Sequence, residues 1–201
     1  MALSTKNREL FEQELLEMAI QARGKIEHIY LHWTAGAYGH VYTDYHFCID
    51  ETGQFMIPVG RQLDCLTQKL AHTWQRNGKA VGVAIMGAVG SKAEWPEGEG
   101  LEITWGKRAP ITEAMIDGLA RAVAILCYGL QLPVNVDTVA THAEVAKLDF
   151  YDLQSGDPEC KWDLLRLPFK GVNGNGGDYI RKLVRDYLAQ LERNEYEFRE
   201  H

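Results

Sequence analysis

The segment Ile29-Tyr30-Leu31-His32-Trp33-Thr34-Ala35-Gly36 decides the fold. Its first residues are apolar or aromatic and predict a short buried strand, and the Thr-Ala-Gly sequence that follows predicts a loop. The strand delivers His32, and a histidine at a strand end is held rigidly while it still faces a cleft. That position suits a metal ligand, although a histidine of this kind taken alone is more often structural. Partners elsewhere in the chain have to decide between the two interpretations.

The length and the amino-acid composition are those of a globular protein with one domain. The chain has 201 residues, 46% of them hydrophobic and 24% charged, with a net charge of −7. This acidic balance gives no electrostatic footprint for nucleic acid or an anionic membrane. No apolar run approaches the roughly 20 residues of a membrane span, and residues 1–24 hold no signal-peptide core. We therefore expect no nucleic-acid partner, no membrane insertion, synthesis in the cytoplasm and a monomeric state.

The four cysteines are Cys48, Cys65, Cys127 and Cys160, and none forms a CxxC pair. This scatter argues against a disulfide framework and against a structural zinc knot. Cys48 and Cys127 lie in apolar segments and are expected in the core. Cys160 lies in a polar loop and stays open as a candidate ligand.

The order of predicted elements indicates a single α/β domain over residues 1–201, with a mixed central sheet flanked by helices. Helices are predicted at 4–21, within an N-terminal helical region 1–24, at 113–128, and at 179–195, within a C-terminal region 178–201. After the strand that ends at His32, further strands are predicted at 44–50, 54–59, 80–86 and 136–141, the first two of these as an antiparallel hairpin. Residues 61–77 show helical character, 87–110 are predicted to form a surface excursion, and 143–177 are predicted to be largely irregular.

Two histidines, His32 and His142, stand at the ends of predicted strands. Adjacent strands could bring both imidazoles within about 2.0–2.1 Å of one Zn²⁺, which needs a third protein ligand and an open position for a reactive water. The long loop offers Asp157, Cys160 and Asp163 as that ligand. Spacing alone does not choose among the three.

Five segments together resemble a known family. They are His32-Trp33-Thr34-Ala35-Gly36, Asp44-Tyr45-His46-Phe47, Asn77 to Gly87, Thr141-His142-Ala143-Glu144 and Lys161-Trp162-Asp163. In this order they are similar to the zinc-dependent N-acetylmuramoyl-L-alanine amidases of type 2, a family that includes phage lysozyme-type amidases and peptidoglycan recognition proteins. The resemblance covers roughly residues 26–168 and implies an amidase/peptidoglycan-recognition-like fold.

The resemblance also implies a zinc site. Family members bind zinc through a histidine on the first strand, a histidine late in the chain, and an Asp or Cys preceded two positions earlier by a catalytic lysine. Lys161-Trp162-Asp163 matches that pattern, which makes His32, His142 and Asp163 the expected ligands of Zn²⁺ and Lys161 a catalytic residue. Cys160 remains the second choice for the third ligand.

One position departs from the pattern of many family members. They carry a glutamate general base where this chain has Ala84. Phage lysozyme-type members lack that glutamate and use a tyrosine before the His-Phe pair together with the lysine. Tyr45 stands at that place and is the second expected catalytic residue.

Three further side chains are expected near the substrate: His72, Trp33 and Glu144. Each has a structural alternative. His72 is about as often a packed histidine, Trp33 could form the floor of the site, and Glu144 could orient a ligand from outside, deliver a proton, or be a solvated charge.

The expected function is hydrolysis of the amide between N-acetylmuramic acid and L-alanine in peptidoglycan, in an endolysin-like, bacteriolytic enzyme that acts on the cell wall after release. The alternatives are a peptidoglycan-binding module without catalysis, a cytoplasmic amidase that recycles muropeptides, and a secreted antibacterial effector, which would have an immunity protein as partner.

Overall fold

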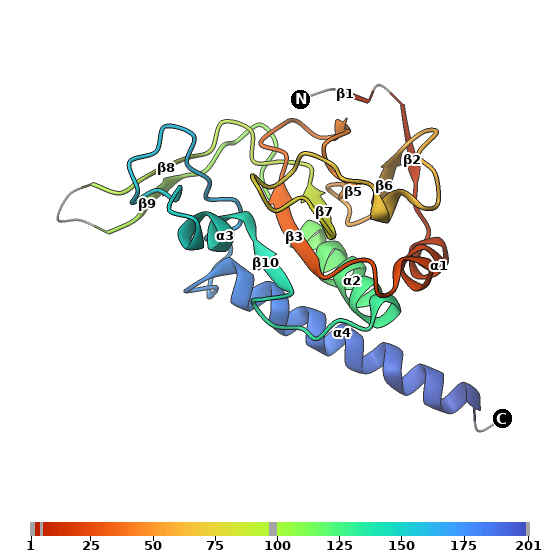
Figure 1. Cartoon of the computed structure of the whole chain (residues 1–201). Coiled ribbons are helices and arrows are strands. Elements are labelled where there is room, and N and C mark those ends of the chain that lie inside the picture. Colours follow the sequence, from red (N-terminus) through yellow and green to blue (C-terminus); the bar gives the residue numbers. More distant parts are fainter. Residues whose placement is uncertain (1–2, 5, 97–99, 200–201) are drawn as a thin grey trace.

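A six-stranded mixed β-sheet forms the centre of the molecule (Figure 1). In this computed structural model, which describes residues 3–4, 6–96 and 100–199, the strand order is β10-β3-β7-β5-β6-β2. The strands are β2 (Asn7–Glu9), β3 (His28–Trp33), β5 (Phe47–Ile49), β6 (Phe55–Pro58), β7 (Ala80–Ile85) and β10 (Val139–Thr141). The first four in the spatial order are parallel, and β6 and β2 are antiparallel to their neighbours. The predicted α/β fold with a mixed sheet is confirmed.

In the described part of the chain, four helices flank this sheet: α1 (Glu12–Ala22), α2 (Glu113–Leu130), α3 (His142–Leu148) and α4 (Gly176–Arg199). Helix α2 packs against α1, α4 and β7, and α4 runs from beside α3 along the domain to the C-terminal end (Figure 1). Two small antiparallel pairs complete the fold, β1 (Leu3–Ser4) with β4 (Val41–Tyr42) and β8 (Lys92–Glu94) with β9 (Glu102–Thr104). None of the described helices has the length and apolar character to cross a membrane.

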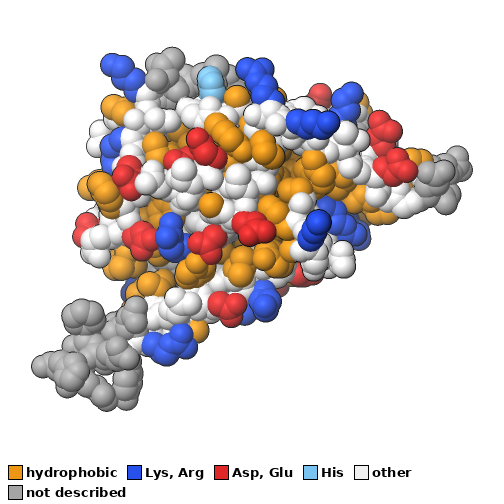
Figure 2. Space-filling view, turned by 180° about the vertical axis from the view of Figure 1, so that it is seen from behind, with side chains coloured by type: hydrophobic (Ala, Val, Ile, Leu, Met, Phe, Trp, Pro, Cys, Tyr) orange, Lys and Arg blue, Asp and Glu red, His pale blue; other side chains and the backbone are white. Residues whose placement is uncertain are grey.

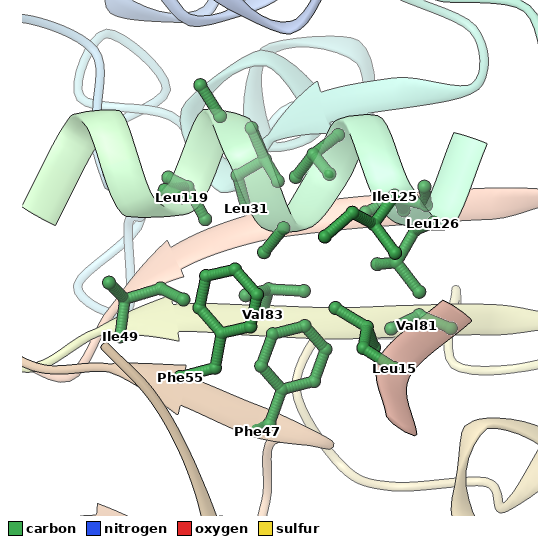
Figure 3. Close-up of a cluster of buried hydrophobic side chains, with 14 of the residues drawn as sticks. Leu15, Leu31, Phe47, Ile49, Phe55, Val81, Val83, Leu119, Ile125 and Leu126 are labelled. Carbon is green, nitrogen blue, oxygen red and sulfur yellow. The ribbon is translucent and has the colours of Figure 1, made fainter. Parts of the chain in front are cut away.

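The main core lies between the sheet and helices α1 and α2 (Figure 3). Alternate strand residues point into it, among them Leu31 of β3 and Val81 and Val83 of β7. Because successive strand side chains point to opposite faces, His32 of β3 projects from the face away from α2. One face of the sheet thus packs against the helices, and the other carries His32 together with two small apolar clusters.

Helix α2 begins where its sequence predicts. The hydroxyl of Thr112 accepts a hydrogen bond from the Met115 amide at 3.1 Å and so caps the helix. The helix continues to Leu130, two residues beyond the predicted end, and most of its residues are buried. The predicted hairpin is also found, with β5 and β6 antiparallel.

The N-terminal prediction needs correction, because the helix starts at Glu12 rather than near Ser4. Residues 7–9 form an edge strand on β6 instead. The amide of Leu10 donates to the carbonyl of Phe55 at 2.7 Å, which extends this pairing to the start of α1. An available sheet edge therefore overrides the helical pattern of the first residues.

Three other predicted segments have different bounds or a different secondary structure in the folded chain. The helical character of residues 61–77 reduces to one 3-10 turn, η1 (Cys65–Thr67), and the strand predicted at 44–50 is limited to β5. Within the region predicted as irregular, residues 142–148 form α3, and α4 begins three residues earlier than expected. The surface excursion contains the β8–β9 pair, although its residues 97–99 lie outside the described chain, as do residues 200 and 201 of the predicted C-terminal helix.

Candidate metal centre and cleft

Strand register brings the two candidate histidines together. Thr141 of β10 pairs with Leu31 of β3 in parallel register, so the next residues, His142 and His32, lie side by side. The Nδ1 atoms of the two imidazoles are 3.1 Å apart. His142 is the first residue of α3, so its ring is placed by both the strand and the helix start.

Asp163 joins them from the C-terminal loop. Its Oδ2 atom lies 3.6 Å from Nδ1 of His32 and 3.5 Å from Nδ1 of His142. Ligands 2.0–2.1 Å from a tetrahedral zinc are about 3.3–3.4 Å from one another, so the three donor atoms have the spacing of a zinc site with one open position. Within the described residues these three side chains form the group with metal-ligand geometry. The donor set therefore fits the metal that the sequence implies.

The protonation states also suit a metal. Burial lowers the pKa of His32 to about 4, so its imidazole is neutral at pH 7. Burial opposes ionisation of Asp163, but the contacts of its carboxylate with the rings of His142 and His32 outweigh this effect and hold the carboxyl pKa below its usual range. Neutral imidazole and ionised carboxylate are the forms that bind Zn²⁺.

The hydroxyl of Thr73 contacts His32 on the side of the ring that faces away from the other candidate ligands. With Nδ1 facing the other ligands, Nε2 carries the proton and donates to Oγ1 of Thr73 at 3.3 Å. Thr73 Oγ1 also lies 2.9 Å from Nδ1 of His72. The side-chain oxygen of Asn77 accepts from the amides of both His72 and Thr73, at 3.0 and 2.8 Å. Such partners fix the tautomer and the ring orientation of a ligating histidine.

His46 holds a neighbouring position without joining the ligands. Its Nδ1 accepts from the Gly82 amide at 2.9 Å, and its Nε2 donates to the carbonyl of Gln68 at 3.0 Å. Both ring nitrogens are thus satisfied, and burial lowers the pKa of His46 to about 4. Its role is structural, because it ties the segment before β5 to β7.

Two of the three candidate ligands, His142 and Asp163, line a cleft of about 810 Å³. One wall is formed by residues 71–77 and the other by residues 157–163, with Tyr151 between them. Arg76 donates two hydrogen bonds of 2.6 Å to the carboxylate of Asp149 and so ties the first wall to the end of α3. The volume is in the range of a small-molecule or peptide site.

Both predicted catalytic side chains line this cleft. The Lys161 side chain is 38% exposed, and its Nζ lies 3.7 Å from the Glu159 carboxylate. The ring of Tyr45 lies 5.2 Å from that of His32, and its hydroxyl donates a long hydrogen bond of 3.4 Å to the carbonyl of Trp33. Burial raises the pKa of the Tyr45 hydroxyl far above 10, so the group is protonated at neutral pH and can donate a hydrogen bond.

The residues expected to bind substrate are placed differently from one another. His72 and Trp33 line the cleft but are almost fully buried, at 6% exposure each. Trp33 packs edge-on against Trp162 and Trp105, so it supports the floor of the site. Glu144 is not brought to the cleft, since its carboxylate is engaged by Thr141, Asn175 and Arg181. The carboxylate faces the start of α4 because it belongs to the N-terminal cap of α3.

Sequence reasoning did not assign a role to Trp74, whose side chain lies at the cleft. Trp74 is 61% exposed and packs edge-on against Tyr151 at 5.9 Å. A single exposed aromatic residue in a loop belongs to no hydrophobic repeat, so the sequence pattern does not single it out. Asp157 and Cys160, the other candidate ligands, also line the cleft but are not part of the ligand group.

Ala84 occupies the place beside His32. The two residues are paired in the parallel β3–β7 ladder, so their side chains share a face of the sheet. Ala84 is fully buried and packs in a small cluster with Tyr45, Cys48 and Met86. The space next to the ligand is therefore filled by apolar groups and the tyrosine ring.

The family model described as N-acetylmuramoyl-L-alanine amidase matches residues 22–160. That span contains His32 and His142 and stops just before Lys161 and Asp163. No curated protein matches the chain. The position of Asp163 beside the two histidines therefore comes from the structure and not from the matched span.

Proposed function

This chain belongs to the N-acetylmuramoyl-L-alanine amidase family, and on that basis we propose that it is a zinc-dependent hydrolase that cleaves the amide between N-acetylmuramic acid and L-alanine of peptidoglycan. The observation that carries the zinc dependence is the spacing of His32, His142 and Asp163, whose donor atoms are 3.1–3.6 Å apart. This triangle leaves one open position toward the cleft, as catalytic zinc sites do.

His32, His142 and Asp163 would hold the ion beside the cleft. When bound, zinc supplies an acidic water near neutral pH and polarises the scissile carbonyl. The protein's contribution is to fix the coordination number and to keep the ligands in their binding protonation states. Burial keeps His32 neutral, and the contacts with the two histidines keep Asp163 ionised against the effect of burial.

Lys161 supplies positive charge next to this centre. Its ammonium group is a donor with no acceptor capacity, and it lies at the cleft wall two residues before Asp163. A donor aimed at the oxygen that becomes negative during amide hydrolysis stabilises the transition state. We assign Lys161 this role.

Tyr45 is the second donor. Its hydroxyl stays protonated, and its present bond to the Trp33 carbonyl is long enough at 3.4 Å to be exchanged for a stronger one. With Glu144 away from the cleft, proton delivery to the departing L-alanine amine rests on Lys161 and Tyr45. Ala84 contributes no proton-transfer group.

The setting that we propose is action on the cell wall, as in endolysins. The substrate implied by the family is peptidoglycan. On the face seen in Figure 2, acidic and basic side chains are interspersed rather than gathered by sign. We assign substrate recognition to the cleft, because His142, Asp163 and both proposed donors line it.

Digestion of purified sacculi followed by mass spectrometry of the products tests the reaction. We expect free stem peptides that begin with L-alanine, and glycan strands left intact. Cleavage between sugars, or within the stem peptide, would refute the assignment. A parallel digestion of soluble muropeptides separates the settings, since a recycling enzyme would release peptide from muropeptides and leave sacculi untouched.

A further inference from the structure

Helix α4 lies beyond the segment that matches the family, yet its N-terminal turn packs against the segments that carry two of the three ligands. The match ends at residue 160, and α4 begins at Gly176. One set of contacts reaches the β10–α3 junction next to His142. A second set reaches the loop that follows Asp163.

The contacts on the His142 side converge on Glu144. Thr141 and Glu144 form a capping box, in which the Thr141 hydroxyl accepts from the Glu144 amide at 3.2 Å and the Glu144 carboxylate accepts from the Thr141 amide at 2.8 Å. His142 lies between them as the first helical residue. Its backbone direction is therefore set by this box.

Arg181 of α4 clamps the same carboxylate. Its two terminal nitrogens donate to the two Glu144 oxygens at 2.9 and 2.7 Å. It also donates to the carbonyl of Val139 in β10 at 3.0 Å and to Asp178 at 2.6 Å. Arg181 is 3% exposed, and a bidentate pair of this kind is stronger and more directional than a surface ion pair.

Two glycines allow α4 to approach this closely. A Cβ at Gly177 would lie 2.5–2.7 Å from the Glu144 carboxylate atoms, and a Cβ at Gly176 would lie 2.2 Å from the carbonyl oxygen of Leu164. Leu164 directly follows Asp163, and the Gly176 amide donates to the next carbonyl, that of Leu165, at 3.1 Å. The first turn of α4 thus touches the supports of both His142 and Asp163.

We propose that Arg181, acting through Glu144, is a positioning residue that sets the metal affinity of the His32–His142–Asp163 site. This inference rests on the proposed zinc dependence. A metal site tolerates ligand displacements of only about 0.2 Å, so a change at the capping box that rotates His142 weakens binding. Arg181 itself touches neither metal nor substrate.

The test compares zinc dissociation constants, measured by competition with a chromophoric chelator, and the absorption spectra of the Co²⁺-substituted full-length protein. In Arg181→Met we expect zinc binding at least about tenfold weaker, the size of effect found for groups that orient ligands, and an altered Co²⁺ spectrum. Arg181→Lys, which keeps the charge but not the bidentate fork, should fall between Arg181→Met and the wild type.

A second variant covers the case in which Arg181→Met does not fold. Gly177→Ala favours the helix intrinsically but displaces the Glu144 carboxylate, so it should weaken zinc binding without loss of α4. The matched control is Val184→Ala, also in α4 and fully buried in the main core, which should lower the melting temperature and leave zinc affinity unchanged.

Two results would overturn the inference alone, namely wild-type zinc affinity in both Arg181→Met and Gly177→Ala, or an equal loss of affinity in Val184→Ala. A wild-type protein that binds no stoichiometric zinc would instead refute the proposed function, and the inference with it.

Discussion

The Nδ1 atoms of His32 and His142 lie 3.1 Å apart although 110 positions separate the residues in the sequence. The parallel pairing of β3 with β10 accounts for this, because it aligns the two strand ends. Two imidazoles and a carboxylate that converge on one point form an arrangement that a cation stabilises, since a metal ion accepts the lone pairs that the donor atoms direct at one another. The fold thus assembles a candidate metal site from strand register and one loop residue.

The first prediction concerns the third ligand. Asp163→Ala removes the only carboxylate in the ligand group of the described residues, so we expect loss of stoichiometric zinc and of amidase turnover. Zinc content after dialysis, measured by atomic absorption, is the readout. Cys160→Ser is the matched control and should keep one zinc per chain. If Cys160→Ser loses the metal and Asp163→Ala retains it, the assignment of the third ligand is wrong.

The second prediction concerns Lys161. Lys161→Met keeps the length of the side chain and removes its charge, so kcat should fall by about 10²–10³, as for loss of one oxyanion donor. Zinc content should not change, because Lys161 is not in the ligand group. Lys170→Met, an exposed lysine away from the cleft, should behave as the wild type. Undiminished turnover in Lys161→Met would remove Lys161 from the mechanism.

Tyr45 gives a third prediction. Tyr45→Phe preserves the ring packed beside His32 and removes only the hydroxyl, so we expect lower kcat with unchanged zinc affinity and little change in KM. Steady-state kinetics on a muropeptide substrate separates these quantities. An increase in KM alone would mean that the hydroxyl binds the substrate in its ground state and does not act in the transition state.

The ligand set could be reached from the sequence because its signals are local. His32 ends an apolar run, and the spacing of Lys161 to Asp163 matches a family pattern. The sequence left several roles open for Glu144, because its partner Arg181 lies 37 positions away and nothing local indicates the pairing. A usable signal was present, since Thr141 and Glu144 have the Thr-x-x-Glu spacing of a capping box. That spacing predicts α3 and a carboxylate turned toward its own helix start.

The edge strand β2 shows a second reason why part of the fold could not be predicted from the sequence. Residues 7–9 continue a helical pattern toward α1, and the pairing with β6 depends on an edge that exists only in the assembled sheet. Local propensity is a weak prior where tertiary hydrogen bonds compete. The exposed position of Trp74 at the cleft is likewise a property of the folded walls.

A fourth prediction follows from the buried histidines. Burial lowers the pKa of His46 from about 6.5 to about 4, so the unfolded chain binds more protons between these values. The free energy of unfolding of metal-free protein should therefore be constant above about pH 6.5 and fall as the pH drops toward 4, by up to about 3 kcal/mol for this residue. Urea unfolding in the presence of a chelator at several pH values measures the slope. His46→Asn, which keeps an acceptor for Gly82, should show a shallower slope, and parallel curves would contradict the assignment.

The last prediction tests the packing behind the metal centre. A Cβ at Gly82 would lie 2.4–2.7 Å from ring atoms of His72, and His72 is fixed through Thr73 to His32. Gly82→Ala should therefore cost about 1–3 kcal/mol of unfolding free energy, as overpacking of a core does, and should also weaken zinc binding because it displaces the support of His32. Gly78→Ala, at a position with no atom within 4 Å of an added Cβ, should change stability by no more than about 0.5 kcal/mol. Urea midpoints and zinc dissociation constants of both variants test this prediction. If Gly82→Ala matches Gly78→Ala in stability and in zinc affinity, His72 can move without consequence for the site.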